Sequence, residues 1–220
     1  MTETWGASVG HLHWGWDLWW KGGGWRKADP PNSPQHLIWA DAERVLPKAP
    51  DAVFALVRDP AARMMSEYRY QRAHRRGRRA GRWLARLPFS LWLRCMLAVA
   101  ARNPYAFDNH LRPQGDFIPD HARVFRLEDG LDRAIDWLAE ATGTPALDPP
   151  RHLLTTGQGP PTQALPDPAT LARIGAAYAG DYRRFGYALP PGPPPKRDPG
   201  DRIAAFIAPL VAALDRRGLV

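Results

Sequence analysis

A continuous apolar run, DAVFALV at residues 51–57, is followed at once by the turn signal Arg-Asp-Pro at 58–60. Uninterrupted apolar character over so short a stretch is typical of a parallel-sheet strand covered on both faces, so it predicts a central strand. Because proline fits the first turn of a helix, a long helix is predicted from about residue 60 to 78. A second strand is predicted at ARVFRL, residues 122–127.

Helical spacing of apolar residues marks the remaining elements. A helix is expected to start at Ser33, whose hydroxyl suits an N-cap, with Pro34 in the first helical position. Further helices are predicted at 88–102, 130–142, 168–186 and 201–216. The last has an apolar stripe, expected to dock on the body of the protein or on a partner, made of Ile203, Phe206, Ile207, Leu210, Val211 and Leu214.

Strands and helices alternate along the chain, which predicts the α/β class, helix-dominated, with a small parallel sheet flanked by helices. The 220 residues suit one domain with a sizeable core. Clustered prolines separate the elements. We therefore predict a domain over residues 1–188, a stiff Pro-rich linker over 189–200 and a C-terminal amphipathic helix over 201–220.

The chain carries a formal net charge of +8, with a pI of about 10.1. A basic protein favours anionic partners such as nucleotides, nucleic acids, anionic lipids or acidic glycans, and charge does not choose among them. Seven of the arginines fall between residues 72 and 86. This run either binds a polyanionic glycan or is a solvated helix face and loop.

The single cysteine, Cys95, lies in the apolar stretch LWLRCMLAVA and is expected to be a buried structural thiol. One cysteine forms neither an intramolecular disulfide nor a cysteine-based metal site, and no metal is expected. No apolar run is long enough to span a membrane, and the first residues lack the pattern of a signal peptide. A cytoplasmic protein without a membrane span is therefore predicted.

Arg58 directly follows the predicted strand, at the edge of an open α/β sheet where ligands bind. Ser66 lies about two turns into the following helix. A guanidinium fork and a hydroxyl together suit a phosphate group. The alternative is that Arg58 pairs with Asp59 or a helix end while Ser66 only caps or packs, and the two residues alone leave both interpretations open.

The segment VFALVRDPAARMMSEYRYQR, residues 53–72, resembles the 3′-phosphate-binding motif of sulfotransferases that use 3′-phosphoadenosine 5′-phosphosulfate (PAPS). The resemblance implies a P-loop-NTPase-like core with PAPS as co-substrate. It further implies that Arg58 and Ser66 hold the 3′-phosphate and that Arg63 braces the turn. The residues that match at the family's spacing are Arg58, Asp59, Pro60, Arg63, Ser66 and Tyr68.

Four further segments resemble the carbohydrate-acting sulfotransferases, in order along the chain. GHLHW at 10–14 is similar to the segment that carries the catalytic histidine of uronyl 2-O-sulfotransferases. DNHLRPQGDF at 108–117 is similar to the segment after the family's apolar helix. ARVFRLEDG at 122–130 resembles a strand of that subgroup, and YAGDYRRFGY at 178–187 its C-terminal pattern.

The resemblance implies transfer of a sulfuryl group from PAPS to a hydroxyl of a carbohydrate-type acceptor. Histidine suits the general base of such a transfer, and His11 and His13 are the candidates. If their segment is a strand, both side chains face the same side. His110 and Arg112 are candidates for contacting a sulfated or carboxylated sugar. The alternatives are structural or exposed histidines in a Trp-rich loop, and a block around 110–112 that packs internally.

The family's loop for the 5′-phosphosulfate, which resembles Pro-Lys-x-(Ala/Gly)-(Gly/Ser)-(Ser/Thr), is not found in this sequence. The run at 22–24 follows Lys21 but lacks the Ser or Thr and lies after the histidine segment. We therefore expect an N-terminally incomplete core, through a misplaced start, a truncation or true loss, with weak or absent activity. Two other functions stay open: a non-catalytic protein that binds nucleotides or acidic glycans, and a basic nucleic-acid-binding protein, for which no specific motif is found.

Overall fold

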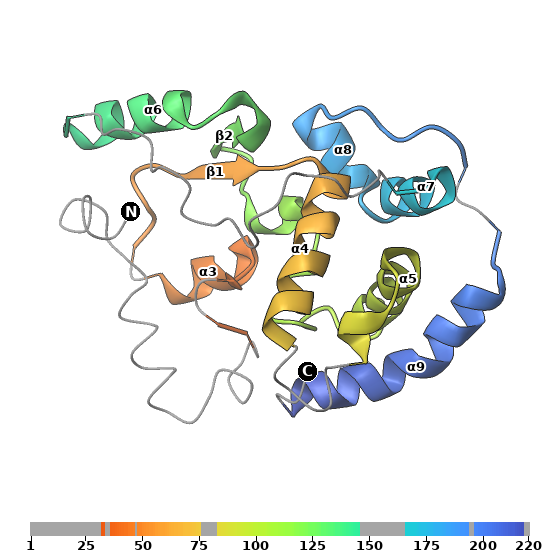
Figure 1. The fold of residues 1–220 in the computed structure, drawn as a ribbon. Helices are drawn as coiled ribbons and strands as arrows, with labels where there is room; N and C mark the ends of the chain where they lie inside the picture. Colours follow the sequence, from red (N-terminus) through yellow and green to blue (C-terminus); the bar gives the residue numbers. More distant parts are fainter. Residues whose placement is uncertain are drawn as a thin grey trace. The chain divides into compact units, whose positions relative to one another are not determined.

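The computed structural model describes residues 32–33, 36–46, 48–75, 83–145, 166–193 and 196–217. The chain divides into two compact units. The first consists of Met1–Arg58 and Asp116–Leu153, and the second of Asp59–Gly115 and Leu154–Val220. Most of the described secondary structure is helical, with one small parallel sheet (Figure 1). The α/β class, helix-dominated, is therefore confirmed.

The first unit holds the sheet. Strand β1 (Phe54–Val57) pairs in parallel with β2 (Arg123–Arg126), and Val57 lies opposite Arg126. The helices of this unit are α3 (Trp39–Val45), the short 3₁₀ turn η5 (Leu127–Asp129) and α6 (Asp132–Thr142).

Aromatic side chains join helix α6 to the sheet. The Trp137 ring lies 5.6 Å from the Phe54 ring and 6.1 Å from the Phe125 ring, measured between ring centroids. Since Phe54 and Phe125 belong to the two strands, one tryptophan contacts both. Gly143, with φ 65°, ends α6 in the left-handed conformation that glycine adopts without steric cost.

The predicted strands and their parallel pairing are confirmed, but the predicted central position of the first strand is wrong for the described residues. Within them the sheet has the order β1-β2, so β1 has one paired edge. Only Val57 of β1 is buried, and Leu56 is 40% exposed. In the described structure, this apolar run therefore forms a strand that is not covered on both faces.

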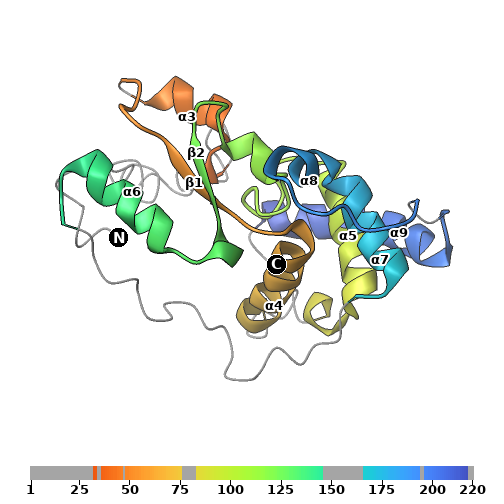
Figure 2. The same cartoon turned by 90° about the horizontal axis from the view of Figure 1, so that it is seen from above.

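The second unit is a helical assembly built around α5 (Phe89–Ala100). The other helices are α4 (Pro60–Arg75), α7 (Pro168–Ala177), α8 (Ala179–Phe185) and α9 (Pro199–Arg216), with the 3₁₀ turn η3 (Leu84–Arg86) before α5. Figure 2 shows α5 beside both α7 and α9. The 3₁₀ turn η4 (Gln114–Phe117) lies where the chain passes from this unit to the first. The core is made largely of Met64, Trp92, Leu93, Met96, Ile174 and Val211.

The sequence patterns located most helices and misplaced some of their ends. The first described α-helix, α3, begins at Trp39, with Ile38 and not Ser33 as its N-cap residue. The helix predicted over 168–186 is broken at Tyr178, whose hydroxyl donates to the Leu111 carbonyl at 2.8 Å. The buried thiol is confirmed, since Cys95 is fully buried and burial raises its pKa.

Helix α9 starts earlier than predicted and packs through a face that overlaps the predicted stripe only in part. It begins at Pro199, because Asp198 and Asp201 form a capping box at its N-terminus. The buried residues of α9 are mostly small, and the predicted stripe is divided. Val211 is buried and Ile207 and Leu214 pack against the core, whereas Ile203, Phe206 and Leu210 are exposed, Phe206 to 88%. Small side chains let the backbones of α9 and α5 approach closely. The buried positions of α9 are Ala204, Ala208, Val211, Ala212 and Asp215.

None of the described helices is long and apolar enough to cross a membrane.

The substitution Ala208→Leu tests this packing. Ala208 is fully buried, so a larger side chain should force α9 away from α5 and lower the free energy of unfolding by about 1–3 kcal/mol. Urea unfolding followed by tryptophan fluorescence measures the change. The matched control is Ala205→Leu, at an exposed position of the same helix. Equal stabilities of the two variants would contradict the docking described here.

Candidate functional site

A strained loop after α5 forms the centre of the candidate site. Phe107, Asp108 and Asn109 have φ values of 54°, 56° and 65°, in the left-handed region that residues other than glycine seldom adopt. Such strain persists where neighbouring groups hold the backbone, and it is common at functional sites. The Phe107 amide donates to Oδ2 of the buried Asp215 of α9 at 2.9 Å, which fixes the start of the loop.

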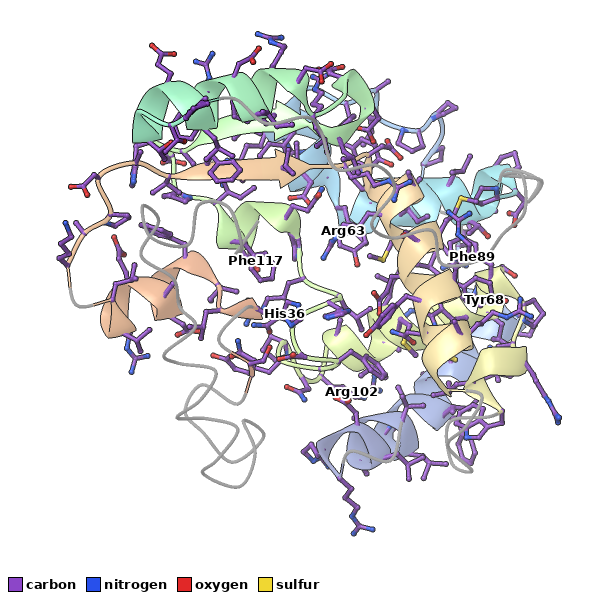
Figure 3. All side chains as sticks on the ribbon, turned by 60° about the vertical axis from the view of Figure 1, so that its left-hand side comes forward. His36, Arg63, Tyr68, Phe89, Arg102 and Phe117 are labelled. Atoms are coloured by element: carbon purple, nitrogen blue, oxygen red, sulfur yellow. The ribbon has the colours of Figure 1, made fainter. Side chains whose placement is uncertain are left out.

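Arg63 of α4 clamps the end of this loop. Its Nη1 donates to the Arg112 carbonyl at 2.7 Å and its Nη2 to the His110 carbonyl at 2.9 Å. The Tyr178 hydroxyl binds the carbonyl between them, that of Leu111. Figure 3 shows Arg63 on α4. The guanidinium of Arg63 is thus bound to carbonyls 47 and 49 residues away, and its implied role in bracing the turn at 58–60 stays a prediction.

A row of hydrogen-bonded polar side chains continues from Arg63 along the same face of α4. Glu67 Oε2 lies 3.0 Å from Nδ1 of His110, and Gln71 donates to Glu67 Oε1 at 2.6 Å. The buried Trp92 indole N–H donates to Gln71 at 3.1 Å. Residues spaced by four lie on one helix face, so α4 presents a single hydrogen-bonded row to the loop and to α5.

The Glu67–His110 pair shifts the pKa of both groups. Burial lowers the pKa of His110, but the hydrogen bond and negative charge of Glu67, with the charge of Asp108, raise it above its ordinary value. Burial raises the pKa of Glu67, but the hydrogen bond and charge of His110 lower it below its ordinary value. Both shifts favour the charged pair.

The buried Asp181 of α8 joins two of the segments that carry the resemblance, 108–117 and 178–187. Its carboxylate accepts the amide N–H of Gln114 at 2.7 Å and that of Gly115 at 2.9 Å. Arg184, one turn further along α8, donates to the Gly115 carbonyl at 2.8 Å. A Cβ at Gly115 would lie 3.3 Å from Asp181, which favours glycine at this close approach.

The N-terminus of α4 is satisfied by its own turn. Asp59 Oδ1 accepts the amide of Ala62 at 2.9 Å and the Asp59 carbonyl accepts that of Arg63 at 2.8 Å. Pro60, in the first helical position, has no N–H. Few backbone donors therefore remain for an anion at this helix end, and an anion bound here needs side-chain donors.

A buried tyrosine hydroxyl lies near the same turn. Tyr182 of α8 is fully buried, and its hydroxyl makes no well-formed hydrogen bond to a described residue. Burial and the charge of Asp59 raise its pKa to about 12, although the Ala61 amide opposes this shift. The phenol therefore stays protonated and retains a donor beside the start of α4.

The two predicted phosphate-binding residues, Arg58 and Ser66, belong to different compact units of the chain. Arg58 follows β1 directly and is half-buried at the end of the first unit. Ser66 is half-buried on α4, in the second unit. The predicted base candidates, His11 and His13, lie outside the described residues, as do residues 76–82 of the arginine run.

The predicted acceptor-binding pair takes part in the loop itself. The His110 ring contacts Glu67, as above, and Arg112 Nε donates to Asn109 Oδ1 at 3.2 Å and to the Pro104 carbonyl at 3.1 Å. The Arg112 guanidinium also lies over the Tyr105 ring, 5.1 Å from its centroid. These contacts fit the interpretation in which the block packs internally, and they leave binding of a sugar untested.

Sequence reasoning missed the groups that hold the loop. Glu67, Gln71 and Asp215 lie on helices that were predicted, at spacings that place each on a buried face. A charged or amide side chain on a buried helix face signals a buried partner, but the sequence does not identify that partner.

Comparisons with protein-family models, with curated proteins and with solved structures give no significant match to this chain. The case for a function therefore depends on the residues and on their geometry.

The Glu67–His110 pair predicts a pH dependence of stability. The His110 contribution is complete below its ordinary pKa of 6.5 and is lost as the pH rises through the raised pKa. The Glu67 contribution is complete above its ordinary pKa of 4.5 and is lost as the pH falls through the lowered pKa. We expect the pair to stabilise the fold most between these two values, as measured by urea unfolding across the range.

Glu67→Gln should remove the fall in stability above pH 6.5, because the neutral amide no longer favours the imidazolium. Glu140→Gln, at an exposed acidic position of α6, is the control and should keep the wild-type profile. A Glu67→Gln profile parallel to that of the wild type would contradict the pairing.

Substitution of Asp181 tests the junction between the two segments. Asp181→Ala leaves the amides of Gln114 and Gly115 without their acceptor and should cost roughly 2–4 kcal/mol of unfolding free energy. Asp181→Asn keeps one acceptor oxygen and should lose about half as much. Chemical denaturation gives both values, with Asp136→Ala, at an exposed position of α6, as control. A loss in Asp181→Ala no larger than in this control would disprove the assignment.

Proposed function

We propose that this protein is related to the PAPS-dependent sulfotransferases and binds the 3′-phosphate end of the nucleotide around Arg58 and Ser66. The observation that carries the proposal is the order strand, Arg-Asp-Pro turn, helix, with β1 ending at Val57 and α4 beginning at Pro60. The same order accompanies the 3′-phosphate motif that residues 53–72 resemble.

The hydrogen bonds at the N-terminus of α4 support binding of the phosphate by side chains. Since Asp59 occupies the amides of Ala62 and Arg63, a phosphate at the turn needs donors such as the Arg58 guanidinium and the Ser66 hydroxyl. The protonated Tyr182 hydroxyl is a further donor on this side of α4. Arg63, whose guanidinium is bound to the loop, is left out of the phosphate site and positions residues 110–112.

The proposed reaction is transfer of a sulfuryl group from PAPS to an acceptor hydroxyl, with His11 or His13 removing the proton of that hydroxyl. A carbohydrate-type acceptor is proposed from the resemblance of residues 108–117 and 178–187. The contacts of Asp181 with Gln114 and Gly115 support a common role for these two segments. His110 and Arg112 then shape the acceptor side by holding the loop.

The sequence contains no recognisable loop for the 5′-phosphosulfate, so nucleotide binding is a sharper test than turnover. A protein that keeps the 3′-phosphate half alone would bind the nucleotide without transferring the sulfuryl group. This non-catalytic function is the second candidate, and nucleotide binding without turnover would support it.

Isothermal titration calorimetry of the full chain with adenosine 3′,5′-bisphosphate tests the proposal. Arg58→Ala should weaken binding about tenfold or more, because a charge-assisted hydrogen bond contributes about 1.5–3 kcal/mol. Ser66→Ala removes a neutral donor and should weaken binding a few fold.

Matched controls remove the same groups elsewhere. Arg183→Ala removes an exposed arginine from α8, and Ser90→Ala removes a half-buried serine from α5. Both should bind the nucleotide as the wild type does. Absence of binding by the wild type, or equal losses in Arg58→Ala and Arg183→Ala, would disprove the phosphate site. Salt-sensitive binding of random DNA without nucleotide binding would favour the nucleic-acid alternative.

A further inference from the structure

The second unit contains a cavity of about 640 Å³ that the proposed function does not use. Helices α5, α7 and α9, with the residues just after α5 and just before α9, form its walls. Its size lies within the range of small-molecule sites, roughly 300–1,000 Å³. The basic residues of its lining are Arg94, Arg102, Arg173, Arg197 and Arg202.

Two of these arginines belong to a compact ion-pair network. Arg94 contacts Asp198 at 2.7 Å and Asp201 at 3.5 Å, and Arg173 contacts Asp198 at 3.1 Å and Asp201 at 2.8 Å. The network fixes both guanidinium groups against the N-terminus of α9. Gly200 permits this approach, since a Cβ there would lie 3.1 Å from Nη1 of Arg94.

The network does not satisfy all of its buried hydrogen-bond donors. The Nε atoms of Arg94 and Arg173 are both buried. The Arg94 Nε faces Oδ1 of Asp201 at the long distance of 3.5 Å, and the Arg173 Nε makes no hydrogen bond to a described residue. A buried donor without an acceptor is unfavourable and points to a group that the described residues do not supply.

The remaining three arginines carry charge that the network does not balance. The Arg102 Nη1 donates to the Ala98 carbonyl at 2.8 Å, which orients this guanidinium at the end of α5. The guanidinium groups of Arg197 and Arg202 have no hydrogen bond or ion pair with any part of the chain that the structure describes. Five arginines against Asp198 and Asp201 leave an excess of three positive charges around one cavity.

Apolar side chains form the rest of the lining. Leu97 and Ala98 of α5 and Ala204 and Ala205 of α9 line the cavity. A cavity with convergent cationic groups and apolar walls suits an anion that has an organic body. Arginine forks match the geometry of tetrahedral oxyanions, with which they form paired hydrogen bonds.

We propose that this arginine cavity binds a small organic phosphate or sulfate ester. The charged group contacts Arg102, Arg197 and Arg202, and the organic part packs on the apolar wall. This site is separate from Arg58 and Ser66 and does not depend on the proposed nucleotide site.

Calorimetric titration of the full chain with glucose 6-phosphate, glucose 6-sulfate, inorganic phosphate and glucose tests the proposal. At least one of the two esters should bind, and which of them binds more tightly identifies the preferred oxyanion. Inorganic phosphate should bind more weakly than that ester, because it has no organic part to contact the apolar wall. Glucose should not bind. Failure of both esters to bind, or equal affinity for glucose, would overturn the proposal.

Arg102→Gln and Arg202→Gln should each weaken ester binding about tenfold. The control is Arg216→Gln, which removes the same charge from an exposed position of α9 outside the cavity. Equal weakening by this control would mean a general effect of net charge and would overturn the assignment. Thermal unfolding of each variant confirms that the exposed substitutions leave the fold intact.

The same variants separate this site from the nucleotide site. Arg58→Ala should leave ester binding unchanged, and Arg102→Gln should leave binding of adenosine 3′,5′-bisphosphate unchanged. If nucleotide binding is absent while the ester still binds with the expected loss in Arg102→Gln, the proposed function fails and the arginine cavity stands. Loss of ester binding in Arg58→Ala would overturn the separate site.

Discussion

The hydrogen bonds from the Arg63 guanidinium to the carbonyls of His110 and Arg112 hold the second unit together around its most strained segment. Three successive residues of this segment are in the left-handed conformation, which is stable only while its carbonyls and amides have firm partners. Arg63 supplies two of those partners from α4, and Asp215 supplies another from α9. The loop therefore depends on helices that come both before and after it in the chain.

Several charged groups of this unit face a partner that compensates them. Glu67 faces His110, Asp181 accepts two amides, and Asp198 and Asp201 face Arg94 and Arg173. Breaking a buried pair is unfavourable because it leaves an uncompensated buried group. The arginines around the cavity beside α9 differ, because they exceed the acids that face them.

The two binding proposals draw on different physical features. The nucleotide proposal depends on local chain order, a strand leading through Arg58 into α4, and on the resemblance of the surrounding segments. The arginine cavity depends on tertiary packing, since its lining comes from α5, α7, α9 and the residues next to α5 and α9. A protein with both sites would hold two different anions.

The sequence by itself determined the elements that local patterns specify: both strands, their parallel pairing, and the positions of α4, α5 and α6. Apolar periodicity and proline placement are local features of the sequence, so they predict an element without knowledge of the fold. The tertiary structure alone decided that small residues of α9 dock on α5 while Phe206 stays exposed, and that Tyr178 breaks a predicted helix. It also decided which partner each buried charge meets. Close helix approach and long-range hydrogen bonds depend on residues distant in sequence, and no local pattern encodes them.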